Sequence, residues 1–348
     1  MPSSPVPRGC PMTDGLYLRA NGEIACWGHF GDMHVLDQVD EAWLRRPDSN
    51  LVELPKLLEL RRSFRDGRLP FPDLCGDCPV LGDGELPDGK PRRLDKLLIE
   101  LSYLCQLRCP ACFSPRDRAE RGKPPFLLSP ALLEAFLDRL GADGVEAVRF
   151  VHFEGRGDPF ANPDAFELIR QVRRAYPMAE IQLTSHGVYG FDPRLMDCGI
   201  DILRFSIDGA KAETYGRYRR GGDFAKVLAH LRSIRDHRRA SRSRMRVVWK
   251  YLVFAWTDSD RELALAGSLA DELEAELLFV LPEENTGRSP RLGDVASLAR
   301  AAARAAPRAS LYECLDQAGT AGMHRRLEHS AEQAGAALVR ARAAIADG

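Results

Sequence analysis

The sequence of 348 residues predicts an α/β protein with a partial (β/α)6 barrel, preceded by a small Cys-rich segment and followed by a helical one. Two observations predict this fold. Between residues 91 and 291, six short apolar runs alternate with longer amphipathic stretches, the pattern of a parallel sheet covered by helices. Polar side chains also recur at every second position within several of these runs, so they share one face of each strand.

The hydrophobic pattern places the individual elements. Strands are predicted at 97–102, 147–154, 180–184, 202–208, 246–254 and 275–281. Helices are predicted between them, at 129–140, 163–175, 224–238 and 260–273. Ser129 followed by Pro130 is a typical N-cap and first-turn pair, which supports the start of the first helix.

The alternating polar residues predict a shared interior of TIM type. They are Glu100, Ser102, His152, Glu154, Glu180, Gln182, Thr184, Arg204, Ser206, Asp208 and Lys250. Burying so many polar groups is costly unless each finds a partner. A ligand inside the barrel would supply such partners, and mutual hydrogen bonding without a ligand is the alternative.

Composition divides the chain into three predicted parts, 1–90, 91–291 and 292–348. The first contains four cysteines and little sustained helical periodicity, and it ends in a linker rich in Gly, Pro and Asp from Gly82 to Pro91. The last is rich in Ala and Arg with helical spacing and few strand formers. We therefore expect a small metal-binding segment, a barrel and a C-terminal helical segment.

Charge and hydropathy exclude several classes of function. With a formal net charge of -1, the protein has no overall positive charge that would attract nucleic acid or a membrane surface. No apolar run approaches the length of a membrane span. The first eight residues lack the apolar centre of a secretory signal, so we expect a cytoplasmic protein. The basic run 237–246 is expected to be a solvated helix end, with a phosphate-binding patch as the alternative.

Nine cysteines in a reducing compartment indicate metal binding rather than disulfides. Cys105, Cys109 and Cys112 directly follow the first predicted strand. Three thiolates at this spacing can hold three corners of an iron–sulfur cube and leave the fourth iron open. Structural zinc is the competing interpretation, but it usually takes four ligands, and no fourth ligand follows Cys112 closely.

From about residue 94 to 290 the sequence resembles the radical S-adenosylmethionine (SAM) superfamily. The spacing CxxxCxxC is that family's signature, and an aromatic residue, Phe113, follows it here. The segment Glu-Gly-Arg-Gly-Asp-Pro at 154–159 resembles the family's GxGEP segment, with Asp158 in place of the usual Glu. Glycines in such a segment let the backbone approach a ligand closely.

Three later segments extend the resemblance in the expected order. Residues 184–187 stand in the place of the family's "TNG", 206–210 resemble its "SIDG" strand, and 218–222 resemble "YRxGG". The resemblance implies a [4Fe–4S] cluster and SAM bound near Phe113, Gly155, Gly157, Asp158, Thr184, Ser206, Asp208 and Arg219. Ser206 and Asp208 would bind the ribose hydroxyls, and Arg219 would pair with the SAM carboxylate.

A second metal site is expected in the first part of the chain, from Cys10, Cys26, Cys75 and Cys78. Asn21-Gly22 predicts a hairpin turn between the first two of these cysteines. The stretch 10–26 resembles the auxiliary-cluster modules called SPASM or twitch, although such modules usually follow the barrel. The resemblance implies a second [4Fe–4S] cluster, and a structural zinc with the same four ligands is the alternative.

Two cysteines remain. Cys198 is expected to be a small buried side chain at the non-catalytic end of the barrel. Cys314 belongs to the last part of the chain, where it could donate a hydrogen atom to a substrate radical as a catalytic residue; an ordinary core cysteine is the alternative.

The resemblance implies that the reduced cluster cleaves SAM and that a 5′-deoxyadenosyl radical then removes a hydrogen atom from the substrate. The polar interior and the acids after the last strand predict substrate contacts at His152, Glu154, Lys250, Glu283 and Glu284. Several acids among few bases suit a hydroxyl- and amine-rich molecule. We therefore expect dehydrogenation or epimerisation of a carbinol centre in a carbohydrate- or aminoglycoside-like compound, as in antibiotic biosynthesis.

Other functions stay open at this point. One is the maturation of a ribosomal peptide by the same chemistry. Another is an iron–sulfur carrier or a zinc-bound interaction protein, against which the SAM-binding segments argue. A flavodoxin- or ferredoxin-type protein is the expected reductant, and no nucleic-acid or membrane partner is expected.

Overall fold

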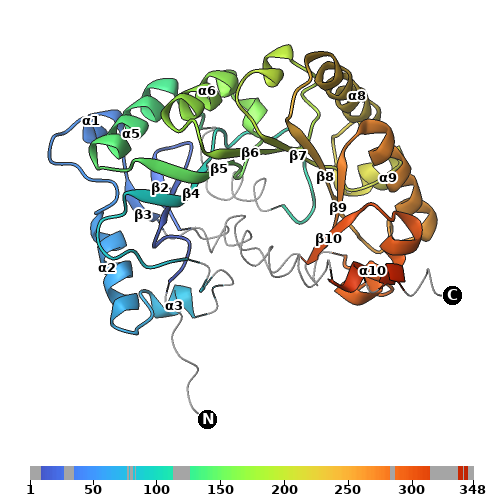
Figure 1. The fold of residues 1–348 in the computed structure, drawn as a ribbon, viewed down its shortest axis with the longest axis horizontal. Coiled ribbons are helices and arrows are strands. Elements are labelled where there is room, and N and C mark those ends of the chain that lie inside the picture. Colours follow the sequence, from blue (N-terminus) through green and yellow to red (C-terminus); the bar gives the residue numbers. More distant parts are fainter. Residues whose placement is uncertain are drawn as a thin grey trace, which may run out of the picture. The chain divides into compact units, whose positions relative to one another are not determined.

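The computed structural model describes residues 9–26, 35–76, 78, 81–82, 84–112, 126–282, 287–313, 336–339 and 341–343. These residues divide into two compact units (Figure 1). Unit 1 contains the described residues up to 104 and those from 126 to 182. Unit 2 contains residues 105–112 and the described residues from 183 onward.

Unit 1 is built on a mixed set of strands. Its order is β6-β5-β4-β1-β2-β3. The strands are β1 (Gly15–Leu18), β2 (Glu23–Ala25), β3 (Val35–Gln38), β4 (Arg93–Ile99), β5 (Ala147–Phe153) and the first half of β6 (Glu180–Ser185). Strands β1, β4 and β5 are parallel, whereas β1, β2 and β3 pair antiparallel. The predicted hairpin turn is confirmed, since Gly22 joins β1 to β2 with a φ of 83°.

Helices of unit 1 follow the strands and end as their sequences indicate. They are α1 (Glu41–Leu44), α2 (Pro55–Arg65), α3 (Pro72–Cys75), α5 (Pro130–Ala142), α6 (Ala165–Ala175) and the 3-10 turn η1 (Pro159–Ala161). The Oγ atom of Ser129 accepts a hydrogen bond from the Leu132 N–H at 3.1 Å, so the predicted N-cap of α5 is confirmed.

Unit 2 continues the parallel pattern. Its order is β10-β9-β8-β7-β6, with the second half of β6. The other strands are β7 (Ile202–Ser206), β8 (Arg246–Leu252), β9 (Glu276–Leu281) and β10 (Ser310–Glu313). Its helices are η2 (Pro193–Met196), α7 (Ala212–Tyr218), α8 (Phe224–Ser241), α9 (Asp260–Leu273) and α10 (Val295–Ala305).

The predicted α/β fold with parallel strands is confirmed, and its strands are consistent with a partial barrel. Each of the six predicted strands and four predicted helices has a counterpart with ends shifted by a few residues. The features that were not predicted include α2, the parallel pairing of β1 with β4, and β10, which pairs in parallel with β9 inside the segment expected to be helical. The division into three parts stays a prediction.

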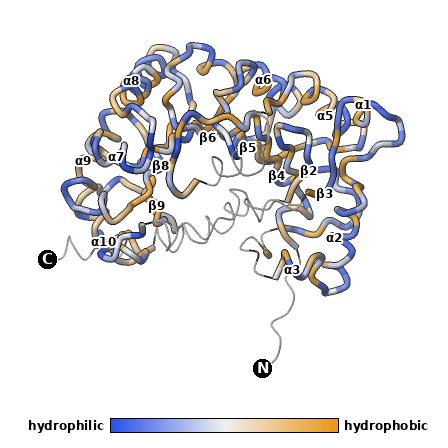
Figure 2. Tube along the Cα trace, turned by 180° about the vertical axis from the view of Figure 1, so that it is seen from behind, coloured by the Kyte–Doolittle hydropathy of each residue, from blue (hydrophilic) through white to orange (hydrophobic). Residues whose placement is uncertain are grey.

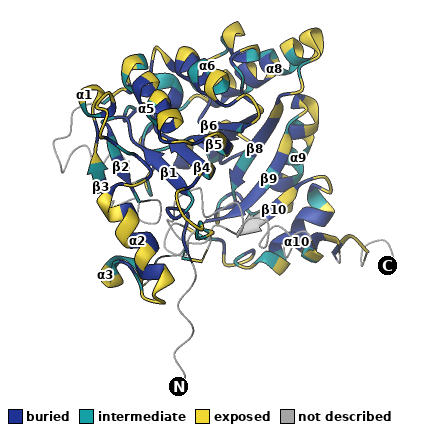
Figure 3. Cartoon of the chain, turned by 60° about the vertical axis from the view of Figure 1, so that its left-hand side comes forward, coloured by how far each residue is buried: buried dark blue, intermediate teal, exposed yellow. Residues whose placement is uncertain are grey.

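The strands form the buried layer of each unit. All five residues of β7 are buried, and so are the last three of β5. Figure 2 shows β4 and β5 as largely hydrophobic and α5 and α6 as alternating. In Figure 3 most strands are mainly dark blue, β3 is largely teal, and α5, α6, α8 and α9 carry exposed outer faces. This is the layering that the alternation of apolar and amphipathic stretches predicts.

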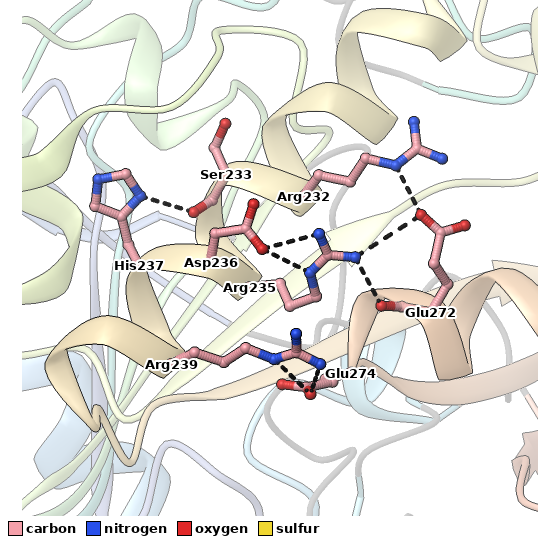
Figure 4. Close-up of polar contacts among 8 residues, drawn as sticks. All are labelled: Arg232, Ser233, Arg235, Asp236, His237, Arg239, Glu272 and Glu274. Carbon is pink, nitrogen blue, oxygen red and sulfur yellow. Dashed lines mark hydrogen bonds and ion pairs between the residues drawn. The ribbon is translucent and has the colours of Figure 1, made fainter.

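The basic run after residue 237 lies at the end of α8 and in the turn before β8. Basic side chains of α8 pair with acids near the end of α9 (Figure 4): Arg232 Nε donates to Glu272 at 2.7 Å, and Arg239 Nε donates to Glu274 at 2.9 Å. These side chains are exposed. The run is therefore a solvated helix end, as expected.

No helix in the described part of the chain is both long and apolar enough to cross a membrane.

Candidate functional site

The cysteine triplet of unit 2 belongs to one apolar cluster. Leu107, Cys109, Tyr218 and Phe254 form its buried centre, and Cys105 and Cys112 pack against it. The loop is held by backbone hydrogen bonds, from Cys112 N–H to the Cys109 carbonyl at 3.1 Å and from Arg108 N–H to the Arg220 carbonyl at 2.9 Å. This short loop thus places all three cysteines at one apolar cluster.

Arg219 connects this loop to the end of β7. Its Nη1 atom lies 3.6 Å from the Cys109 Sγ atom, and its Nε atom donates to Asp208 Oδ2 at 2.5 Å. Burial raises the pKa of the Cys109 thiol, and the guanidinium charge of Arg219 opposes that rise. Burial disfavours the charge on Arg219, but the negative charges of Asp208, Cys109 and Tyr218 together outweigh burial and raise the pKa of Arg219. Arg219 is therefore a fixed cation beside a thiol of the triplet.

Asp208 is fully buried, and hydrogen bonds reach both of its carboxylate oxygens. Oδ2 accepts from Arg219, and Oδ1 accepts from the Leu252 N–H at 2.9 Å. The resemblance places Asp208 on the SAM ribose and Arg219 on the SAM carboxylate. In the structure the two residues hold each other instead, so ligand contacts there would compete with this pair.

His186 anchors the triplet loop from the end of β6. Its Nδ1 atom accepts a hydrogen bond from the Val188 N–H at 3.1 Å. The proton therefore belongs on Nε2, which donates to Gln106 Oε1 at 3.0 Å. Gln106 stands between Cys105 and Cys109, so this bond ties the loop to the segment 184–187.

Three further residues predicted to bind ligands lie at the strand ends of unit 2. Ser206 is 8% exposed, and Thr184 and Lys250 are half-buried. Each of these side chains is only partly accessible to a ligand. Their roles in ligand binding stay predictions.

In unit 1, the segment 155–158 packs on the end of β4. A Cβ atom at Gly157 would overlap the carbonyl oxygens of Ser102 and Leu104, so only glycine fits there. The Asp158 N–H donates to the Leu104 carbonyl at 2.8 Å, and Asp158 Oδ1 accepts from the Phe160 N–H at 3.0 Å. This segment is thus fixed against the residue directly before the cysteine triplet.

A buried charged group that the sequence analysis did not assign supports the same segment. Glu100 accepts a hydrogen bond from the Arg156 N–H, and its carboxylate also lies near Arg19. Burial raises the pKa of Glu100, whereas Arg19 and the Arg156 N–H oppose the rise. A signal existed in the sequence, because the charged Arg19 directly follows the apolar run of β1.

In unit 1, the predicted substrate contact His152 bonds to another residue of the predicted polar interior. His152 Nε2 lies 2.5 Å from Gln182 Oε1, and Gln182 Nε2 donates to Glu180 Oε1 at 2.6 Å. His152 is buried and Glu154 is half-buried. Mutual hydrogen bonding therefore satisfies part of this polar row without a ligand, which was the alternative interpretation.

The four N-terminal cysteines lie in unit 1 and influence one another. Burial raises the pKa of the Cys10 thiol well above its usual range, and the charges of Cys26, Cys78 and Cys75 raise it further. Cys10 therefore lies within electrostatic range of the other three. The Cys78 N–H donates to the Cys75 carbonyl at 3.2 Å, which closes a turn between this pair.

The chemistry of both cysteine sets fits iron–sulfur ligation, because soft thiolates are the donors such clusters take. Among the described residues, no three Cys, His, Asp or Glu side chains already stand at metal-binding distances. All eight cysteines among the described residues are free thiols. Cys198 is buried, as expected, with its Sγ atom 3.4 Å from the Leu195 carbonyl.

Some predicted site residues lie outside the described residues. They are Phe113, Glu283, Glu284 and Cys314.

The sequence matches a family model. Residues 99–253 match the model described as the radical SAM superfamily. The matched segment contains the cysteine triplet, the 155–158 segment and Arg219. Residues 99–253 therefore resemble a radical SAM domain, and that family implies a [4Fe–4S] cluster and SAM.

Curated relatives match part of the chain. The chain is 27% identical over 153 residues to the GTP 3′,8-cyclase of Lactiplantibacillus plantarum, covering 41% of this chain and 42% of that protein. It is 26% identical over 166 residues to the GTP 3′,8-cyclase of Rhodopseudomonas palustris, covering 45% of each. The chain thus spans less than half the length of these relatives.

Solved structures include a radical SAM methyltransferase from Sphaerobacter thermophilus, with 16% identity, a TM-score of 0.49, and coverage of 65% of this chain and 69% of that one. They also include methylornithine synthase, with 18% identity, a TM-score of 0.44, and coverage of 84% and 81%.

Proposed function

We propose that Cys105, Cys109 and Cys112 hold the [4Fe–4S] cluster, and that the chain uses it to form a 5′-deoxyadenosyl radical from SAM. When bound, the cluster supplies the single electron that cleaves SAM. The observation that carries the proposal is the packing of all three thiols around one apolar cluster, with the cation of Arg219 beside Cys109.

The chain's own residues prepare this chemistry. Leu107, Tyr218 and Phe254 bury Cys109 with them, and a water-poor setting strengthens electrostatic interactions there. Arg219 offsets negative charge that three thiolates would gather. Gln106 and His186 keep the loop in one conformation, so that little reorganisation accompanies ligand binding.

In unit 1, SAM is proposed to contact the segment Gly155 to Asp158, which the family resemblance names. The close approach of Gly157 to Leu104 supports this, since the backbone there is rigid and lacks a side chain. Arg219 would have to exchange Asp208 for a SAM carboxylate, or share it.

For the substrate, we propose a hydroxyl-rich small molecule whose carbinol C–H bond loses its hydrogen atom to the radical. In unit 1, the buried His152 and the half-buried Glu154 support a polar partner. A hydrogen atom returned from a thiol such as Cys314 would give an epimer. Loss of a proton and one electron, the electron passing to a second cluster, would give a ketone.

A nucleotide substrate is the second candidate, favoured by the relatives named GTP 3′,8-cyclase. The radical SAM chemistry would be the same, and the substrate would differ. Incubation of the reconstituted protein with SAM and either GTP or aminoglycoside precursors separates the two. Turnover of GTP would exclude the carbohydrate proposal.

We also propose that Cys10, Cys26, Cys75 and Cys78 bind a second [4Fe–4S] cluster. Their mutual electrostatic influence supports a common site, and zinc is the competing ligand. Metal analysis decides between them: about eight irons per chain indicates two clusters, whereas about four irons with one zinc assigns this set to zinc.

The main test uses anaerobically reconstituted protein with dithionite and SAM. Wild type is expected to form 5′-deoxyadenosine, and Cys109→Ala is expected to lose both this product and about four irons. Cys198→Ala is the matched control, because it removes a buried thiol outside both sets and should retain iron and product. Formation of 5′-deoxyadenosine by Cys109→Ala would reject the assignment.

A further inference from the structure

Strand β1 brings the N-terminal segment to the carboxyl end of the parallel strands in unit 1. Leu18 pairs with Ile99 of β4 in parallel register. The next residue on each strand is charged, Arg19 after Leu18 and Glu100 after Ile99. The Glu100 N–H still donates to the Leu18 carbonyl at 2.9 Å, so the two charged residues are held at one level.

Arg19 is only 1% exposed, and its partners are acids. Its Nε atom lies 3.5 Å from Glu100 Oε2, and its Nη1 atom pairs with Glu23. In the described residues, Arg19 Nη2 and Glu100 Oε2 have no hydrogen bond. Because a buried charge depends on its partner, removal of Arg19 would leave Glu100 strongly destabilised.

Glu100 in turn contacts the backbone of the segment that we propose for SAM binding. Its Oε1 atom accepts the hydrogen bond of the Arg156 N–H. A Cβ atom at Gly155 would overlap the Glu100 carboxylate, so the backbone lies directly on this side chain. A shift of Glu100 would therefore shift the backbone at Gly155 and Arg156.

The ring of Tyr103 provides a second connection. The guanidinium carbon of Arg19 lies 4.9 Å from the ring centroid, and that of Arg156 lies 5.8 Å from it. Both distances are within the range of a cation–π contact. Arg19 thus reaches the 155–158 segment through Glu100 and through Tyr103.

We propose that Arg19 is a positioning residue for SAM binding, which acts by holding Glu100 under the Gly155–Arg156 backbone. The N-terminal hairpin would then set the SAM affinity of the radical SAM domain. This inference rests on the proposed function, because SAM binding at this segment is itself proposed.

The test compares Arg19→Met with Arg61→Met in the reconstituted full chain. Arg61 is a matched control, since it is also buried in unit 1 but bonds to the carbonyls of Thr13 and Val52. We expect Arg19→Met to weaken equilibrium SAM binding about tenfold, within the range of measured couplings between sites. Arg61→Met should lower the thermal midpoint without changing SAM affinity.

A second readout needs no SAM. Hydrogen exchange of the Arg156 amide should be faster in Arg19→Met than in wild type and unchanged in Arg61→Met. In a Glu100→Gln background, Arg19→Met should add little, because its effect passes through Glu100. If Arg19→Met fails to fold, Arg19→Lys gives the same comparison with the charge retained, and should show intermediate exchange.

The outcomes separate the two ideas. Wild-type SAM affinity and exchange in Arg19→Met would overturn the inference, as would equal losses in both Arg variants. Absence of SAM binding by wild type would overturn the proposed function, while exchange at Arg156 would still decide whether Arg19 positions this segment.

Discussion

The Nη1 atom of Arg219 lies 3.6 Å from the Cys109 Sγ atom, and the same guanidinium bonds to the buried carboxylate of Asp208. The arrangement aims a fixed N–H donor at one thiol of the triplet. Hydrogen bonds to cluster sulfur favour the more negative, reduced state of an iron–sulfur cluster. We therefore expect Arg219 to tune the cluster proposed at this triplet, in addition to any contact with SAM.

Substitution of Arg219 by Met should make the reduction potential of the cluster more negative, because the reduced state loses a donor and a cation. An EPR-monitored redox titration measures this directly. Arg217→Met is the control, since Arg217 lies in the last turn of α7, two residues before Arg219, but contacts the ring of Trp256. An unchanged potential in Arg219→Met with intact iron content would contradict the assignment.

Gly157→Ala should weaken SAM binding at least about tenfold, since the added methyl group would overlap two carbonyl oxygens and displace the backbone. Equilibrium binding of SAM is the measurement. Gly141→Ala, in α5 where a Cβ atom meets nothing within 4 Å, should bind SAM as wild type does. Retained affinity in Gly157→Ala would show that this segment does not contact SAM.

His186→Phe should make the triplet loop more mobile and speed loss of iron, because the bond to Gln106 disappears. The rate of bleaching of cluster absorbance in the presence of a chelator measures this effect. Gln106→Ala should have a similar effect, and the double variant should be no worse than either single one. Additive rates would mean that the two residues act separately.

Glu262 stabilises the turn after β7 from the start of α9. Its carboxylate accepts from Thr214 Oγ1 at 2.5 Å and from the Ala210 N–H at 2.9 Å, and it pairs with Lys211 at 2.9 Å. Burial alone would raise the pKa of Glu262, but these contacts outweigh burial and lower it. Its ionised form therefore contributes to stability.

Glu262→Gln should lower the free energy of unfolding at pH 7 by about 1–3 kcal/mol. The native pKa lies below the unfolded value of about 4.3, so this stabilisation is present above that pH and is lost as the pH falls through the native pKa. Urea unfolding of both proteins across this range measures it, with exposed Glu272→Gln as control. If the difference in unfolding free energy between wild type and Glu262→Gln did not change with pH, this would contradict the account.

The strands of the barrel were predictable because each is a short apolar run bounded by turn residues, as Ile202–Ser206 shows. The parallel pairing of β1 with β4 was not predictable. The residues Gly15–Leu18 indicate a strand, but they do not determine which strand it pairs with. Helix α2 was missed although Leu57, Leu60 and Phe64 follow helical spacing. Strand β10 is short and adjoins an Ala-rich helix, which obscured it.

The spacing of the cysteine triplet could be found in the sequence because it is local, and its role as a cluster site stays a prediction. The partners of Arg219 could not be predicted, because its approach to Cys109 joins residues far apart in the chain. The same holds for the contacts of Arg19 with Glu100 and of Glu262 with the turn after β7. An isolated charge directly after an apolar strand, such as Arg19 after Leu18, is a signal that could have been followed.

The central claim is that the triplet carries a cluster whose open iron binds SAM. The EPR spectrum of the reduced, reconstituted protein tests it most directly, recorded before and after addition of SAM. We predict that SAM changes the spectrum of wild type, and that Cys109→Ala lacks the responding signal. A reduced [4Fe–4S] signal that stays the same at saturating SAM would contradict the account.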